Sequence, residues 1–172
     1  MHIQLLHDSI ARLTQSALSI IEQDTELANF RACLTAAKGI ADASVVTLLG
    51  ELYLVPRELR SAQVSRHAGL DVRLAESGSS MKRPGRLSKA GNAYLRAALH
   101  MPALSLVHHD ARAKAHYEAL IGRGKKKVQA LSAIQRKMLT ELWTCMKTGQ
   151  PFDIPPQFDN GTVRRMRGVR RP

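Results

Sequence analysis

Apolar residues recur at steps of three and four positions over much of this chain, and this spacing constrains the fold more than any other feature. An α-helix makes 3.6 residues per turn, so the spacing places one apolar stripe on each helix. The stripes are Leu6, Ile10, Leu13, Ala17, Ile20 and Leu27, then Val45, Val46, Leu48, Leu49 and Leu52, then Leu95, Ala98, Leu99 and Leu106, and last Leu131, Ile134, Met138, Leu142 and Met146. The sequence therefore predicts an all-α fold of packed helices.

The composition fits this fold. The chain has 172 residues, of which 44% are hydrophobic and only 4% aromatic. It is long enough for one domain with a real core, and that core must consist mainly of Leu, Ile, Val, Ala and Met. We expect residues 1–36 to form a connecting or dimerisation helix, residues 37–153 the main domain and residues 154–172 a disordered basic tail.

The first stripe predicts one long helix from about His7 to Leu34. At about 1.5 Å per residue it would span roughly 40 Å, which is longer than a small domain needs. Asp24 interrupts the stripe at a seam position. Pairing as a coiled coil and packing as an ordinary core helix therefore remain alternatives.

A second helix follows after a tight turn, because Lys38-Gly39-Ile40-Ala41 separates the first two stripes. Backbone N–H groups at the start of the second helix could bind a phosphate, with Lys38 beside them. A plain packing unit is the alternative interpretation.

Glycine, proline and capping residues set the remaining boundaries. Pro56 ends the second helix, and Ser61 to Leu70 predicts a short helix stopped near Gly69. Asp71 to Ala90 lacks any sustained period and is interpreted as a Ser/Gly loop rich in Lys and Arg. Asn92 is predicted to cap the next helix, which Pro102 kinks, and Asp110 to cap a helix that ends near Gly122. A basic turn at Lys125, Lys126 and Lys127 then precedes a last helix from Val128 to Lys147.

The charge favours a polyanionic partner. Lys and Arg number 26 against 14 Asp and Glu, which gives a net charge of +12 and a pI near 10.4. Nucleic acid is the first candidate. The cationic excess begins only after residue 36, and it continues into the predicted tail through Arg164, Arg165, Arg167, Arg170 and Arg171.

Several other classes of protein are disfavoured. Cys33 and Cys145 have no CxxC spacing, so neither a zinc site nor a disulfide framework is indicated, and a reducing cytoplasm fits best. His100, His108, His109 and His116 lack a nearby acidic or cysteine partner, so we expect no metal site. No apolar run approaches the roughly 20 residues of a membrane span, and no signal-peptide pattern begins the chain. We expect a soluble protein of the bacterial or archaeal cytoplasm, associated with the nucleoid, with no membrane partner.

Four segments in a fixed order carry a resemblance to a known family. They read "LTAAKGIADASVVTLLGEL", "SAQVSRHAGLDVRLAESGSS", "GRLSKAGNAYLRAALHMPAL" and "KKKVQALSAIQRKMLTELWTCMKTGQPFD". Their order and spacing resemble the C-terminal domain of the insertion-sequence transposases called the IS one-ten or IS one-sixteen family, which includes the pilin-gene invertases. The resemblance extends from the end of the first helix to about Asp153.

The resemblance implies a serine nucleophile toward DNA. The family is understood to use the serine of a Ser-Gly pair in the loop after an "AGL" helix, which here is Ser77, followed by Gly78. Ser79 and Ser80 are alternatives, since a loop is easily misaligned by one or two residues. A serine hydroxyl needs cations that hold the charge developing on the phosphate. Composition alone would instead favour a solvated linker.

The resemblance also implies a helix-hairpin-helix with a Gly-Ile-Gly turn, where this chain has Gly39-Ile40-Ala41. The side chain of Ala41 could obstruct a close backbone approach. With the cations around the serine, the predicted nucleic-acid-binding residues are Lys38, Gly39, Lys82, Arg83, Arg86, Lys89, Asn92, Arg96, Lys125, Lys126 and Lys127.

Family members carry an N-terminal ribonuclease-H-like domain whose four acidic residues bind metal ions. Nothing in this chain corresponds to that domain, so we expect Mg2+ only with it and no activity from this chain alone. The implied partners are DNA, a structured guide RNA and further copies of the chain through the first helix. The implied function is DNA strand cleavage and exchange, and the alternative is a non-catalytic DNA- or RNA-binding remnant that regulates a full-length transposase.

Overall fold

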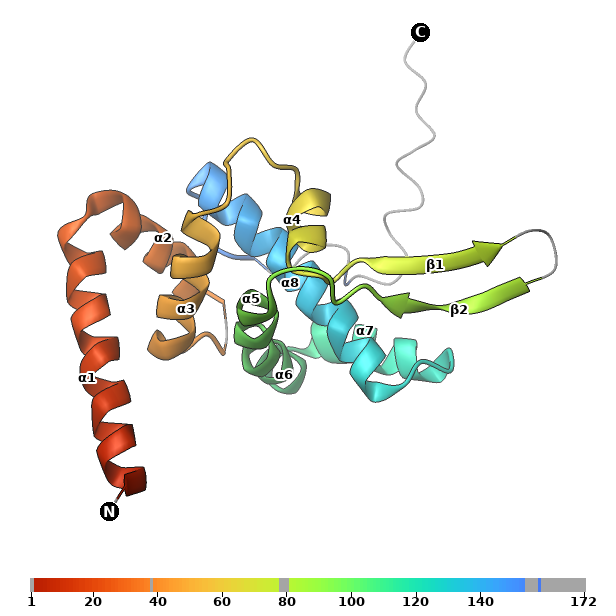
Figure 1. Ribbon diagram of the computed structural model, residues 1–172, viewed down its shortest axis with the longest axis horizontal. Helices are drawn as coiled ribbons and strands as arrows, with labels where there is room; N and C mark the ends of the chain where they lie inside the picture. The colour runs from red at the N-terminus through yellow and green to blue at the C-terminus, as the bar shows by residue number, and fades with distance from the viewer. Residues whose placement is uncertain (1, 38, 78–80, 154–157, 159–172) are drawn as a thin grey trace, which may run out of the picture.

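The fold is a helical body with two projections at opposite ends (Figure 1). The computed structural model describes residues 2–37, 39–77, 81–153 and 158, without the side chains of residues 74–77 and 81–85. The helices are α1 (His2–Gln23), α2 (Thr25–Thr35), α3 (Asp42–Tyr53), α4 (Ser61–His67), α5 (Ala93–Ala98), α6 (His100–His109), α7 (Ala111–Gly122) and α8 (Lys127–Thr148). The strands β1 (Val72–Ser77) and β2 (Met81–Leu87) form an antiparallel hairpin. The all-α class is confirmed.

The last helix, α8, organises the core. It packs against α2, α4, α6 and α7, and its apolar stripe is buried along the whole length of the helix. Trp143 is fully buried, and its Nε1 donates a hydrogen bond to the carbonyl of Leu59 at 2.9 Å. Truncating such a side chain to alanine typically costs about 3–5 kcal/mol. The surrounding core is mainly aliphatic, as the composition predicts.

The prediction of one helix from His7 to Leu34 is wrong, because the chain breaks at Asp24. Asp24 adopts an extended backbone, and its Oδ1 accepts hydrogen bonds from the N–H groups of Glu26 at 2.8 Å and Leu27 at 3.0 Å. This side chain caps α2 and so replaces the helical bonds that a continuous helix would make. In α1 only Leu18 and Ile21 are buried, and the rest of the helix projects from the body.

The turn between α2 and α3 depends on glycine. Gly39 has a φ of +92°, a left-handed conformation that side chains disfavour. A Cβ atom there would also overlap the Cβ of Ser105 in α6. Lys38 lies outside the described residues. The close approach that Gly39 permits is therefore to α6 of the same chain.

Two predicted caps are confirmed. Asn92 Oδ1 accepts from Leu95 N at 3.0 Å, and Asp110 Oδ1 accepts from the N–H groups of Arg112 and Ala113 at 2.9 Å. The kink expected at Pro102 is wrong in position: the chain divides into α5 and α6 at Leu99 instead. Pro102 lies in the first turn of α6, where its missing N–H has no intrahelical partner in any case.

The loop expected over Asp71 to Ala90 is also wrong, since most of this stretch is the hairpin. A ladder of main-chain hydrogen bonds does not require alternating side chains. Gly78, Ser79 and Ser80, and all of the predicted tail except Phe158, lie outside the described residues. Among the described helices none combines the length and the apolar composition of a membrane span.

Gly39→Ala should destabilise the protein, because alanine at a positive φ is strained and its Cβ meets Ser105. We expect the free energy of unfolding to fall by about 1–3 kcal/mol, measured by urea denaturation. Gly50→Ala is the matched control. Gly50 lies inside α3 with open space where a Cβ would stand, so this substitution should raise the free energy of unfolding by about 0.5–1 kcal/mol. Equal effects of the two would contradict the packing of the turn on α6.

Candidate nucleic-acid interface

The hairpin projects from the junction between α4 and α5. Main-chain hydrogen bonds extend its ladder toward the body: Ser88 N donates to Asp71 O at 2.8 Å, and Lys89 N donates to Gly69 O at 3.1 Å. Lys89 itself has a φ of 51°. These bonds fix the direction in which the two strands leave the helices (Figure 1).

An irregularity in β2 explains how a strand accommodates Pro84 and Gly85. The pairs Arg73↔Arg86 and Ala75↔Arg83 are separated by two residues on β1 and by three on β2. The extra residue falls at the Pro-Gly pair. A bulge is where a strand tolerates proline, which has no N–H to donate, and glycine.

The base of the hairpin is closed by the segment that starts α5. A Cβ atom on Gly91, whose φ is +155°, would overlap His67 O, and Asn92 N donates to the same carbonyl at 2.7 Å. Arg96 Nη1 donates to Ala68 O at 2.9 Å, so the two carbonyls at the end of α4 are bound by the N-cap residue of α5 and by a side chain of that helix. We call Gly91, Asn92 and Arg96 the clamp.

The clamp also joins two further helices. Asn92 Nδ2 donates to a carboxylate oxygen of Glu51 in α3. Gln135 Nε2 of α8 donates to the carbonyl of Arg96 at 3.3 Å. The side chain of Asn92 and one guanidinium nitrogen of Arg96 are therefore hydrogen-bonded within the protein, while the assignment of both residues to nucleic-acid binding stays a prediction.

Ser77 is the last residue of β1 and lies opposite Met81, at the end of the hairpin farthest from the body. With about 3.4 Å per residue in an antiparallel strand, its Cα lies about 17 Å from that of Val72. Ser79 and Ser80 lie outside the described residues. Of the three candidate serines, the structure places Ser77 alone, on a projecting strand end.

Cationic residues lie along both strands of the hairpin. Lys82 and Arg83 lie on β2 opposite Glu76 and Ala75. Arg86 lies directly opposite Arg73, and both side chains are exposed. Like charges in a cross-strand pair are destabilising unless an anion relieves them. Arg73 was absent from the sequence prediction, because only the strand register makes it a neighbour of Arg86.

A groove separates the hairpin base from α7 and α8, and it unites cations that are distant in sequence. Its volume is about 430 Å3. It is lined by Leu70, Val72, Leu87, Lys89, Leu120, Lys125, Val128, Gln129, Ser132, Ala133 and Arg136. Lys89 and Lys125 were predicted as binding residues. Arg136 was not, because its position between the apolar residues of a helix gives no sign of the groove.

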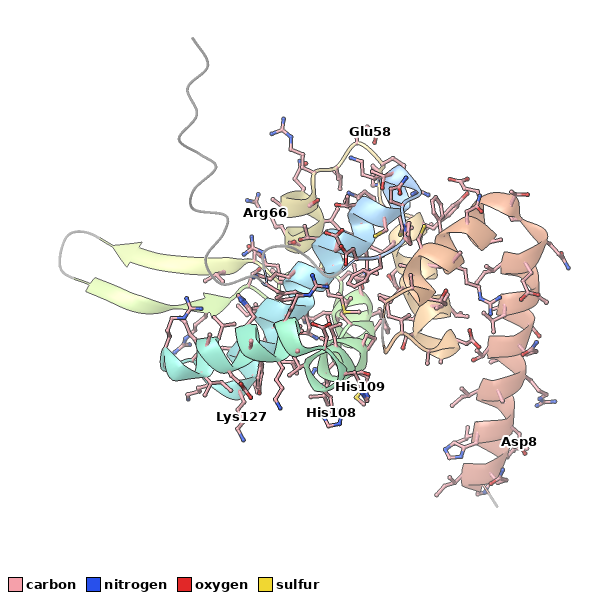
Figure 2. All side chains as sticks on the ribbon, turned by 180° about the vertical axis from the view of Figure 1, so that it is seen from behind. Asp8, Glu58, Arg66, His108, His109 and Lys127 are labelled. Atoms are coloured by element: carbon pink, nitrogen blue, oxygen red, sulfur yellow. The ribbon has the colours of Figure 1, made fainter. Side chains whose placement is uncertain are left out.

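Lys126 and Lys127 continue the basic surface at the start of α8. Lys126 is the N-cap residue of α8, and its backbone N donates to Gln129 Oε1 at 3.0 Å. Both side chains are exposed, and Figure 2 shows Lys127 at the hairpin end of the molecule, far from Asp8 on α1. Cations and an α-helix N-terminus thus share one end of the protein.

The turn at Gly39 offers a less favourable phosphate site. Asp42 lies in the first turn of α3, where its carboxylate is 3.3 Å from Arg31 Nη2. A negative side chain already occupies the electrostatically favourable position at this helix N-terminus. Phosphate binding by Lys38 and Gly39 remains a prediction.

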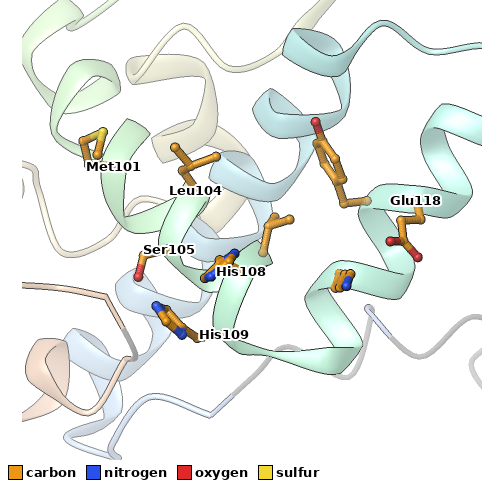
Figure 3. A pocket seen from close by; sticks show the side chains of 9 residues that line it. Met101, Leu104, Ser105, His108, His109 and Glu118 are labelled. Atoms are coloured by element: carbon orange, nitrogen blue, oxygen red, sulfur yellow. The ribbon is translucent and has the colours of Figure 1, made fainter.

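A second hollow, between α6 and α7, contains His108 and His109 (Figure 3). Their rings meet edge to face with centroids 4.8 Å apart. Within the residues that the structure describes, no three His, Cys, Asp or Glu side chains are grouped as metal ligands.

Lys137 of α8 has an unusual environment. Burial, followed by the charge of Arg123, lowers the pKa of its ammonium to about 8. Its Nζ is 3.5 Å from His116 Nδ1 and 4.8 Å from the ring centre of Phe158. At neutral pH this side chain is still mainly protonated, so it adds a positive charge to α8.

The fold and the site define a class: a helical domain with a projecting cationic hairpin and a basic groove at its base. Residues 31–118 match the Transposase IS116/IS110/IS902 family, and the chain belongs to this family. Pilin gene-inverting proteins are similar to it. That of Moraxella lacunata is 33% identical over 153 residues, and that of Moraxella bovis is 29% identical over 148 residues. Each match covers 85% of this chain and 46% of the relative, so the chain spans less than half the length of these relatives.

Arg96→Met should destabilise the fold because it leaves the carbonyl of Ala68 without its donor while keeping the apolar stem. A lost partner of a buried polar group costs about 1–3 kcal/mol, measured as a fall in the free energy of unfolding. Arg86→Met is the control, since an exposed hairpin cation should change that value by less than about 0.5 kcal/mol. If Arg96→Met were as stable as the control, the clamp would not hold the hairpin base.

Proposed function

We propose that this chain takes part in DNA recombination, in strand cleavage and exchange through Ser77. Membership of a transposase family and the similarity to proteins named for gene inversion support a DNA role. The observation that carries the assignment to this site is the hairpin. It holds Ser77 at its projecting end and sets two exposed arginines against each other along its strands.

The chemistry would be a transesterification at a DNA phosphodiester. The Ser77 Oγ attacks phosphorus, an Oγ–P bond forms, and the bond from phosphorus to one deoxyribose oxygen breaks. The hydroxyl proton passes to a base, and the leaving oxygen takes up a proton. Guanidinium and ammonium groups near the serine stabilise the charge that develops on the phosphoryl oxygens.

We propose that the proton acceptor and any Mg2+ come from outside this chain. Four acids near the N-terminus, Asp8, Glu22, Asp24 and Glu26, lie on or between α1 and α2. Figure 1 places those helices at the end opposite the hairpin, so these acids do not fit a metal site for Ser77. We propose that an acidic-tetrad domain supplies this part, and that the chain alone is inactive.

The proposed partners are DNA, a structured guide RNA and further copies of the chain, at the nucleoid. The copies would pair through α1. Ile3, Leu6, Ile10, Leu13 and Ile20 are 58–72% exposed, and with Ala17 they alternate steps of three and four residues. That is the seam spacing of a two-stranded coiled coil.

A second candidate function is a non-catalytic DNA- or RNA-binding remnant that regulates a full-length transposase. It is favoured by the cations gathered at the hairpin end of the molecule. Such a module needs its positive charge, and Ser77 is dispensable for it.

Ser77→Ala should abolish a covalent protein-DNA adduct. The adduct is sought by denaturing electrophoresis after the chain is mixed with a nicked suicide DNA and a separately expressed acidic-tetrad domain. Ser79→Ala and Ser80→Ala are matched controls and should retain the adduct. An adduct that persists in Ser77→Ala contradicts the nucleophile. Salt-sensitive binding with no adduct from any variant supports the second function.

Leu13→Glu should dissociate the oligomer, since a carboxylate in an apolar seam has no partner and must be desolvated. Analytical ultracentrifugation should report an oligomer for the parent chain and a monomer for the variant. Gln15→Glu is the control, because it adds the same charge at an exposed position outside the seam. A parent chain that sediments as a monomer would contradict pairing through α1.

A further inference from the structure

The groove at the hairpin base is lined by both apolar and cationic side chains. We propose that it binds an unpaired nucleotide of a DNA strand, with the base against its apolar walls and the adjoining phosphates on its cations. This inference rests on the proposed role in DNA recombination and deepens it, because it concerns how a strand is held near the hairpin.

The walls of the groove are apolar and accessible. Val72 at the start of β1 is 51% exposed, and Val128 in the first turn of α8 is 73% exposed. They line the groove with Leu70, Leu87 and Leu120 from the hairpin base and α7. When a flat apolar partner displaces water from exposed aliphatic surface in a concave site, the free energy of binding becomes more favourable. The face of a nucleobase is such a partner.

The rim of the groove is cationic. Lys89, Lys125 and Arg136 line it, and its lining contains no Asp or Glu among the residues that the structure describes. Gln129 holds the N-cap of α8 through its Oε1, which leaves its Nε2 group to donate to a base edge. The charge therefore complements phosphate, while the walls complement the base.

The neighbouring hollow shows how a strand could continue. It lies between α4 and α8, has a volume of about 420 Å3 and is lined by Ser61, Ala62, Ser65, Ala133, Arg136, Lys137 and Thr140. Arg136 and Ala133 line both hollows. Arg136 thus stands between two successive sites, where the phosphate that links two nucleotides would lie.

This arrangement favours a single strand over a duplex. In a duplex, stacking on both sides covers the faces of each base, so a hollow with apolar walls can take a base only after it leaves the stack. Sequence-tolerant binding through base faces and a tracked backbone is typical of single-strand sites. The groove lies about one strand length from Ser77, so it would hold a separated strand close to the proposed reaction.

Fluorescence anisotropy with the full 172-residue chain tests this. The probes are a labelled DNA strand, its duplex, the same strand with abasic sites, and the RNA strand of the same sequence. The DNA strand should bind about fivefold or more tightly than the abasic strand and than the duplex. Equal affinity for the intact and abasic strands overturns base binding, and tighter binding of the RNA overturns the assignment to DNA.

Two pairs of variants locate the site. Val128→Glu puts a carboxylate in the groove at an exposed helix N-terminus that tolerates it, and it should remove the preference for the intact strand. Leu54→Glu, at a side chain 81% exposed elsewhere, should keep that preference.

Arg136→Ala should lower the slope of log Kd against log salt by about 0.7 for a single strand. Lys147→Ala, which removes an exposed cation from the other end of α8, should leave the slope unchanged.

Circular dichroism confirms that each variant is folded before binding is compared. If Val128→Glu and Arg136→Ala bind the strand as the parent does, the groove is not the site. If no Ser77 adduct forms, this measurement still stands, because the preference for the intact strand over the abasic strand is measured without any covalent reaction. Absence of all nucleic-acid binding at low salt would overturn both proposals.

Discussion

The end of α4 is the point on which the rest of the site depends. The carbonyls of His67 and Ala68 cannot continue a helix, and the clamp binds them with the N–H of Asn92 and the guanidinium of Arg96. Gly91 permits the close approach of the two backbones. Because Asn92 also bonds α3 and the Arg96 carbonyl bonds α8, the hairpin is rooted in several core helices at once. A projecting strand pair can hold a direction only if its base is rigid in this way.

The two ends of the molecule differ in chemistry. One end carries α1, with an exposed aliphatic seam and few cations. The other carries the hairpin, the start of α8 and the groove between them, where cations and apolar walls meet. Such a division suits a protein that binds further copies of itself at one end and a polyanion at the other, since both partners can be bound at the same time.

Sequence reasoning succeeded where a local rule is sufficient. Asn92 and Asp110 were identified as caps, and the break at Gly39 was placed correctly, because caps and positive-φ turns depend on a few neighbouring residues. The same rule was missed at Asp24, whose place in an apolar stripe was read as a seam position. The hairpin was missed because its strands contain proline, glycine and serine, and its ladder is formed by the main chain. The domain boundaries and the role of Ser77 stay predictions.

The sequence by itself determined the helical class, the basic character of the chain and most of the helix ends, because periodicity, charge and capping are written in short stretches. It also identified Lys89 and Lys125 as cations of interest, without placing them together. Only the tertiary structure brought them to one groove with Arg136, opposed Arg73 to Arg86, and engaged Asn92 and Arg96 inside the protein. These outcomes depend on strand register and on how α8 packs beneath the hairpin, which are contacts between residues far apart in the chain and so leave no local signature.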